Sequence, residues 1–201
     1  MKRLGIIAIV GLCALPARGE QVSLTPNVLH AMTPIGSVPS KADIVRIFPQ
    51  NTVSQLSAIA QDANVDFGVR LRAIRALPQF CLPACAGAPA HQSLVDLLET
   101  ITDTPASEWT GKTLLLLRAT IEAIGNAKSG DTMDVDRIKP FLDNTSRDIR
   151  AATAFALRDL CLQSAVTPLR NRYNIEMTAL GVPQVRLAIS AALRDLNTCG
   201  N

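Results

Sequence analysis

The stretch RAATAFALRDL at residues 150–160 returns as RLAISAALRDL at residues 186–196, 36 residues further along the chain. The two copies are identical at seven positions, and a branched apolar residue precedes each opening arginine, Ile149 in the first copy and Val185 in the second. Apolar residues recur in both copies at the spacing of an amphipathic helix. A helix rebuilt at a fixed period is the sequence signature of a stacked repeat array. The pattern therefore indicates an architecture and says little about an activity.

The composition of the chain favours helices as well. Of its 201 residues 48% are hydrophobic but only 3% are aromatic, so a core must be built from Leu, Ile, Val and Ala. Such filling suits close packing of helices better than a sandwich of aromatic-rich strands. The 20 basic and 17 acidic residues give a net charge of +3, too mild to indicate nucleic acid or an anionic membrane as a partner. We therefore expect an all-α domain that does not bind nucleic acid.

Residues 1–19 have the features of a secretory signal peptide. Lys2 and Arg3 form a short basic start, residues 4–15 are almost uninterruptedly apolar, and Pro16 follows them. Small residues stand at the −3 and −1 positions of a cleavage site that ends at Gly19. The style of the signal is bacterial. We therefore predict cleavage after Gly19 and a periplasmic or secreted protein.

Two alternatives to cleavage remain open. The apolar run is too short to span a bilayer comfortably, so an uncleaved anchor is the weaker reading and no membrane span is expected after processing. Cys13 raises the possibility of a lipid-modified protein, although Leu12 stands where such processing requires a small residue. The sequence leaves the lipidation of Cys13 undecided.

The remainder of the chain divides into a proline-containing extended leader, residues 20–40, and a helical domain, residues 41–201. A short helix ends at Pro49, and helical periodicity then returns in pairs separated by turn residues. The four predicted helix pairs are residues 53–80, 91–126, 135–160 and 163–197.

Local signals predict three of the helix starts. Asp66 is placed to cap the second helix of the first pair, and Ser107 with Glu108 to start the second helix of the second pair. Pro168 is expected in the first turn of the fourth pair, with Thr167 as its cap.

The second helices of the four pairs align on an alanine followed by leucine or isoleucine. These alanines are Ala76, Ala123, Ala156 and Ala192. Six residues before each alanine stands an arginine in three of the copies and Leu117 in the second. Further alanines at residues 73, 152 and 188 are expected to let neighbouring helices approach closely. Exchanging Ala156 for Phe should overpack this interface at a cost of about 1–3 kcal/mol.

These units resemble HEAT-like repeats, whose second helix opens with Val-Arg and continues to Ala-Leu. FLDNTSRDIRAATAFAL at residues 141–157 carries the closest likeness, and DANVDFGVRLRAIRALP at residues 62–78 the next. The resemblance implies a right-handed α-solenoid of about four hairpins, used as a scaffold or binding surface. It also implies a polar ladder, in which an acidic residue of the turn within each repeat pairs with the arginine and with neighbouring repeats. Asp62 and Asp143 stand near this acidic position, but the second repeat has Leu117 in place of the arginine and the fourth has no acid in its turn.

Four cysteines follow the signal peptide, and an even count in an exported chain favours disulfides. Cys161 and Cys199 stand at equivalent helix ends of adjacent repeats, which lie about 8–10 Å apart, and the residues after the last repeat could close the gap. We therefore prefer Cys161–Cys199, with Cys81–Cys85 as the remaining pair. A redox pair, a metal site and free thiols are the alternatives for Cys81 and Cys85.

No motif for catalysis, phosphate binding or metal binding is recognisable, so we expect no enzyme activity, no cofactor and no metal. Gly111-Lys112-Thr113 resembles the end of a phosphate loop but lacks its first glycine and a preceding strand. His30 and His91 are interpreted as surface or capping residues. Trp109 is expected to pack on the connection of the second pair, with a partner contact as the minority interpretation.

A partner surface is the remaining hypothesis, because the resemblance places second helices on the concave side of the array. The candidate residues are Arg72, Arg75, Arg118, Glu122, Arg158 and Arg194. A solvated face held by ion pairs is the alternative for them. The sequence thus predicts a non-enzymatic protein-interaction or scaffold module whose protein partner is unknown. An enzyme accessory or lyase-like helical-repeat protein and a structural spacer in an envelope complex are the other hypotheses.

Overall fold

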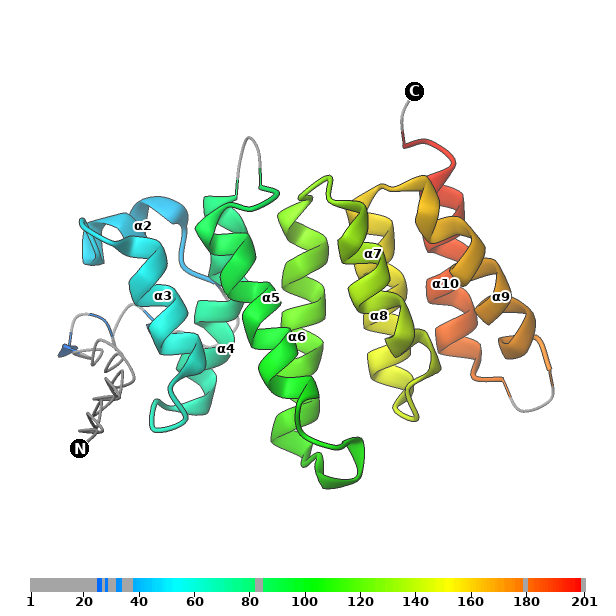
Figure 1. Cartoon of the computed structure of the whole chain (residues 1–201), viewed down its shortest axis with the longest axis horizontal. Coiled ribbons are helices and arrows are strands. Elements are labelled where there is room, and N and C mark those ends of the chain that lie inside the picture. Colours follow the sequence, from blue (N-terminus) through cyan, green and yellow to red (C-terminus); the bar gives the residue numbers. More distant parts are fainter. Residues whose placement is uncertain are drawn as a thin grey trace, which may run out of the picture.

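The computed structural model describes residues 38–81, 85–178 and 181–199, together with Thr25, Pro26, Val28, Met32 and Thr33. The predicted signal peptide, its cleavage site, Cys13 and His30 lie outside the described residues, as does most of the leader. Within the described part every regular element is an α-helix or a 3-10 helix, so the predicted all-α class is confirmed. Figure 1 shows the helices standing in a row from α2 at one end to α10 at the other.

The chain begins its helical part with α2 (Lys41–Ile47) and continues as four helix pairs. The first helices of the pairs are α3 (Thr52–Gln61), α5 (Pro89–Thr102), α7 (Thr132–Ile138) and α9 (Val166–Glu176). The second helices are α4 (Phe67–Ala76), α6 (Gly111–Ala127), α8 (Arg147–Leu160) and α10 (Pro183–Leu196). Short 3-10 helices join or extend them: η1 (Leu77–Phe80), η2 (Ala106–Glu108), η3 (Lys139–Asp143) and η4 (Gln163–Ala165).

The pairs are arranged in two layers. In the second-helix layer α4 packs against α6, α6 against α8 and α8 against α10, so that each helix contacts the next one along the chain. The first-helix layer consists of α3, α5, α7 and α9, each packed on its own partner helix. The four predicted pairs are therefore present as packed helical hairpins.

Small residues bring the second helices close together. A Cβ atom built on Gly125 of α6 would lie 2.5 Å from the Cα atom of Ala156 on α8, so only glycine fits there. The alanines that were expected to seat these helices are all buried: Ala73, Ala76, Ala123, Ala152, Ala156, Ala188 and Ala192. The larger side chains of the core are mostly Leu and Ile, in line with the aromatic-poor composition.

Two of the three predicted helix starts differ from the structure. Asp66 does cap α4, accepting hydrogen bonds from the backbone N–H groups of the next turn. Thr167 does not cap α9, because η4 runs directly into the helix and Thr167 already lies inside its first turn with Pro168. In the second pair Ser107 and Glu108 belong to η2, and the second helix begins only at Gly111.

The start of α6 is explained by Thr110 and Thr113. The Thr110 hydroxyl accepts from the Thr113 N–H at 3.2 Å, and the Thr113 hydroxyl accepts from the Thr110 N–H at 3.2 Å. Threonine replaces the usual acidic member of this reciprocal cap, which is why the sequence signal was missed. Trp109 contacts the connection of the second pair as expected, where its indole N–H donates to the carbonyl of Thr104 at 2.9 Å, and it also packs against the core.

The structure places both preferred cysteine pairs at disulfide distance. The Cα atoms are 4.5 Å apart in Cys81–Cys85 and 5.5 Å apart in Cys161–Cys199. The second pair joins the end of α8 to the turn that follows α10. Among the described helices, none is both long enough and apolar enough to cross a membrane.

Candidate interaction surface

The residue before each aligned alanine of the second helices points to solvent or is half-buried. These residues are Arg75, Glu122, Phe155 and Ala191. Because the second helices lie side by side, the four positions form a row across the layer. We call the exposed side of this layer the second-helix face; its members used below are Arg75, Arg118, Glu122, Phe155, Arg158, Asp159, Leu187, Arg194 and Asp195.

At the N-terminal end of this face, Glu122 is shared by two arginines from neighbouring helices. Arg118, one turn earlier on α6, donates from Nε to the Glu122 carboxylate at 2.7 Å. Arg75 of α4 lies 3.7 Å from the other carboxylate oxygen. The ion pairs thus link α4 to α6 at the surface, above the buried contacts of the same two helices.

At the C-terminal end of this face, Arg158 contacts residues of both α8 and α10. Its guanidinium is 2.7 Å from Asp159 and 3.9 Å from Asp195 of α10, and it stacks on the ring of Phe155 at 5.0 Å from the centroid. The Nε atom of Arg194 also lies 3.2 Å from the carboxylate of Asp195. Stacking and ion pairing together hold the Arg158 side chain over α8.

A groove of about 290 Å³ separates the two ion-pair groups. It lies between α6 and α8 and is lined by Glu122, Asn126, Phe155, Ala156, Arg158 and Asp159. Its floor is Ala156, at the point where Gly125 lets the two helices approach. Phe155, which is 39% exposed, forms one wall. The groove therefore offers one aromatic wall among lining residues that are mostly polar or charged.

The structure brings most of the predicted partner-surface residues together. Arg75, Arg118 and Glu122 are in contact with each other, and Arg158 reaches Arg194 through Asp195. Arg72 lies on α4 as predicted and is half-buried, with its guanidinium beside Gly68. The ion pairs agree with the interpretation of a solvated face, and the partner surface stays a prediction.

Sequence reasoning missed the apolar members of the face. Phe155 and Leu187 were assigned to no site, yet Leu187 is 68% exposed on α10. A register argument could have found Phe155, because it occupies the position that Glu122 and Arg75 take in the earlier pairs. A large apolar residue at a position that is polar elsewhere in the repeat is the signal.

His91 contradicts its sequence interpretation as a surface or capping residue. It is only 3% exposed, and its Nε2 lies 2.8 and 3.0 Å from the two carboxylate oxygens of Asp134 on α7. The reason is that α5 begins at Pro89, two residues earlier than expected, so His91 lies in the first turn and faces the next helix pair. Ser129 also hydrogen-bonds to Asp134.

His91, Asp131 and Asp134 offer ligand atoms within 4.8 Å of one another, the spacing of a metal site. The guanidinium of Arg137 stands between the two carboxylates, 2.8 Å from Asp134 and 3.2 Å from Asp131. Burial acts to lower the pKa of Arg137, but the two carboxylates outweigh it and raise the pKa above its ordinary value. A permanent cation therefore already occupies the position that a metal would take, and the donor set fits a structural ion pair better than a metal centre.

The same cluster does not form a catalytic relay. Nucleophilic catalysis requires the serine hydroxyl to bond to the histidine, with the carboxylate on the far side of the ring. Here Ser129 and His91 both bond to Asp134, and the buried Nδ1 of His91 has no hydrogen-bond partner among the described residues. The cluster joins α5 to α7, and the unpaired ring nitrogen of His91 is buried.

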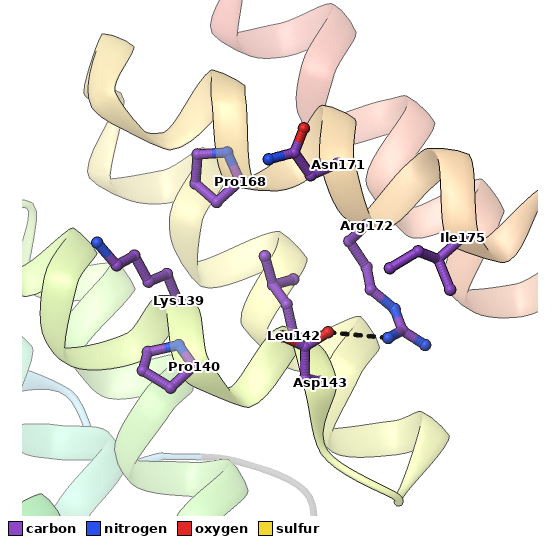
Figure 2. A pocket seen from close by; sticks show the side chains of 8 residues that line it. All are labelled: Lys139, Pro140, Leu142, Asp143, Pro168, Asn171, Arg172 and Ile175. Carbon is purple, nitrogen blue, oxygen red and sulfur yellow. Dashed lines mark hydrogen bonds and ion pairs between the residues drawn. The ribbon is translucent and has the colours of Figure 1, made fainter.

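The repeat arginine Arg150 also finds a partner other than the one expected. Its Nε donates to Glu176 of α9 at 2.9 Å, while its Nη1 donates to the carbonyls of Asn144 and Thr145. Asp143 pairs with Arg172 of the next repeat at 2.9 Å, as Figure 2 shows, so the contact to a neighbouring repeat is present and the described residues show none between Asp143 and Arg150. Asp143 lies at the end of η3 and is exposed, too far displaced to meet the arginine of its own repeat.

Glu176 is the centre of this second buried polar group. It is 1% exposed and accepts from Arg150, from Arg172 at 2.6 Å, and from the N–H of Val182 at 2.6 Å. Burial alone would raise the pKa of Glu176, but the Val182 N–H and the two arginines outweigh it and hold the pKa below its ordinary value. Glu176 is therefore a carboxylate that ties α8, α9 and the start of α10 together.

In the first pair Arg70 meets a backbone carbonyl instead of an acid. Its Nε donates to the carbonyl of Ala60 at 3.1 Å. Burial lowers the pKa of Arg70, and the charge of Asp62 offsets this only in part. The acidic position near Asp62 thus acts on the arginine through its charge.

A second groove, of about 310 Å³, lies in the first-helix layer between η3 and α9. Figure 2 shows Lys139 and Pro140 on one side of it and Pro168, Asn171 and Ile175 on the other, with the Asp143–Arg172 ion pair at one end. Its cations are already paired, Lys139 with Asp136 and Arg172 with Asp143 and Glu176. The charge in this groove is therefore balanced internally.

Comparison of the chain with protein-family models, with curated proteins and with solved structures found no match in any of the three.

Proposed function

We propose that the protein is a non-enzymatic interaction module, a right-handed α-solenoid of four HEAT-like pairs that binds a protein partner through its second-helix face. The observation that carries the proposal is the groove beside Phe155, an exposed aromatic wall between two groups of ion-paired arginines. Aromatic and arginine side chains are the residues that dominate binding energy in protein interfaces.

The packing order of the helices supports the solenoid. Each second helix contacts the next one, and the same register position is exposed or half-buried in all four pairs. Stacked repeats of this kind present one continuous surface built from equivalent positions, which is how repeat proteins bind extended partners. The two cysteine pairs at disulfide distance support a place in an oxidising compartment, such as the periplasm or the outside of the cell.

Site-specific photo-crosslinking in the native cell tests the proposal. A photoreactive phenylalanine analogue placed at position 155 should crosslink to one protein in stoichiometric amount. The same analogue at Gln92, exposed on α5 in the first-helix layer, is the matched control and should not. If Arg118→Glu abolishes the crosslink from position 155 without changing the melting temperature, the partner contacts the second-helix face.

Crosslinking from position 92 with none from position 155 would contradict this assignment and move the binding surface to the first-helix layer. Equal, diffuse crosslinking from both positions would favour the structural-spacer hypothesis.

A further inference from the structure

The chemistry of the partner follows from the hydrogen-bonding balance of the second-helix face. Four arginines, Arg75, Arg118, Arg158 and Arg194, share three carboxylates, those of Glu122, Asp159 and Asp195. Each guanidinium carries five N–H donors in a fixed plane, and each makes only one or two ion-pair contacts here. The arginines are also accessible, from 31% of the side chain in Arg158 to 78% in Arg194. The face therefore has an excess of exposed donors.

Charge is distributed unevenly over a chain that is nearly neutral. The 20 basic residues include Lys2, Arg3 and Arg18 of the predicted signal, so the chain from residue 20 onward has 17, equal to its 17 acidic residues. Exposed carboxylates gather elsewhere, for example Asp96 and Glu99 on α5 in the first-helix layer. An excess of arginine on one face of a neutral protein is a specific local feature and not a reflection of overall charge.

Resting on the proposed function, we infer that the occupant of the second-helix face is an acidic, extended protein segment with one apolar anchor residue. Its carboxylates accept hydrogen bonds from the unused N–H groups of Arg75 and Arg118 on one side of the groove and of Arg194 on the other. Its anchor enters the groove of about 290 Å³ between them, against the ring of Phe155. Arginine binds carboxylates in a bidentate geometry that fixes both position and register.

The spacing of the helices sets the spacing of the motif. Neighbouring packed helices lie about 8–10 Å apart, and an extended chain advances about 3.3 Å per residue. A segment that runs across the layer therefore meets a new helix about every three residues. The groove lies between α6 and α8, so Arg194 on α10 is one and a half helix spacings away, about 12–15 Å. The expected pattern is Asp/Glu, then an aliphatic or aromatic residue about three positions later, then Asp/Glu about four positions after that.

The test selects ligands from a displayed library of random twelve-residue peptides on the immobilised full-length protein. The probe is the library itself, and the baits are wild type, Phe155→Ala, the double variant Arg118→Glu/Arg194→Glu, and Arg170→Glu. Arg170 is exposed on α9, away from the face, and provides the matched control. Thermal unfolding of each bait shows that it is folded before selection.

We expect wild type and Arg170→Glu to enrich the acid–apolar–acid pattern, and the double variant to lose at least tenfold of that enrichment. Phe155→Ala should retain acidic peptides but lose the preference for the central apolar residue. Enrichment of basic or uncharged peptides that still depends on Phe155 would overturn the inference and leave the proposed surface standing. Peptides that bind all four baits equally would count against the surface itself, and no enrichment over empty beads would overturn the inference.

Discussion

The two layers of this protein are held together by different physical means. In the second-helix layer the helices meet through glycine and alanine, and the closest approach is at Gly125 and Ala156. In the first-helix layer successive neighbours are joined by polar side chains: Ser57 to Ser93 between α3 and α5, His91 to Asp134 between α5 and α7, and Asp143 to Arg172 between η3 and α9. The closest backbone approach therefore lies in the second-helix layer, where ion pairs such as Arg75–Glu122 are added at the surface.

The third pair shows a difference in helix length between the layers. α7 has only seven residues before it tightens into η3, whereas α6 and α8 have 17 and 14. A short helix cannot present a continuous apolar stripe to both neighbours, so directional hydrogen bonds replace area there. The grooves of the first-helix layer, such as the one in Figure 2, are the consequence of this looser packing.

Removing Glu176 should have the largest effect on this arrangement. Glu176→Ala leaves Arg150 buried without its carboxylate and the Val182 N–H without an acceptor, and breaking such a buried pair costs about 3–5 kcal/mol. Urea unfolding followed by circular dichroism measures the loss. Asp143→Ala is the matched control, because it removes the other partner of Arg172 at a site that is 73% exposed, and it should cost less than about 1 kcal/mol. Equal losses from the two variants would contradict a buried role for Glu176.

The charge of Glu176 should also appear in the pH dependence of stability. Its pKa in the folded protein lies below its ordinary value of 4.5, so its contribution is present above that pH and is lost as the pH falls through the folded pKa. Urea midpoints measured from neutral pH down to acid should fall more steeply for wild type than for Glu176→Gln. Parallel curves for the two proteins would show that Glu176 does not contribute to the loss of stability at acid pH.

A single added methyl group should destabilise the packing of the second-helix layer. Gly125→Ala would place a Cβ atom 2.5 Å from the backbone of Ala156, and forcing α6 and α8 apart should cost about 1–3 kcal/mol. Gly111→Ala, at the start of the same helix with nothing within 4 Å of the new Cβ, controls for helix propensity and should cost nothing measurable. A stable Gly125→Ala protein would mean that the layer tolerates a wider spacing than its alanines indicate.

In the first-helix layer the corresponding test is His91→Gln. Asp134 keeps its bonds to Arg137 and Ser129, so the loss of the bridge to α5 should cost about 1–2 kcal/mol. Gln92→Leu, at the neighbouring exposed position, is the control. Zinc added to wild type should leave the melting temperature unchanged, because Arg137 occupies the space between Asp131 and Asp134. A large rise would show that the cluster binds metal after all.

The sequence was sufficient to predict the features that depend on short-range periodicity. The helix pairs, the buried alanines and the cap at Asp66 follow from residues within a few positions of each other. It was insufficient for His91 and Glu176, whose partners Asp134 and Arg150 lie 43 and 26 residues away in the chain. It was also insufficient for Phe155, whose role depends on the register of the whole array. An isolated histidine or glutamate has no local signature of burial, because only the packing of the next repeat removes it from water.

Substitution of a surface arginine should have the smallest effect on stability. It tests directly whether ion pairs help to hold the second-helix layer together. Arg118 is 44% exposed and bonds only to Glu122, which keeps Arg75, so Arg118→Ala should cost about 0–0.5 kcal/mol and the loss should shrink as salt is added. Thermal unfolding at low and high salt measures it, with Arg170→Ala as the exposed control. A loss above about 1 kcal/mol would mean that the ion pairs help to hold the second-helix layer together. A negligible loss would mean that these ion pairs are not what holds the second-helix layer together.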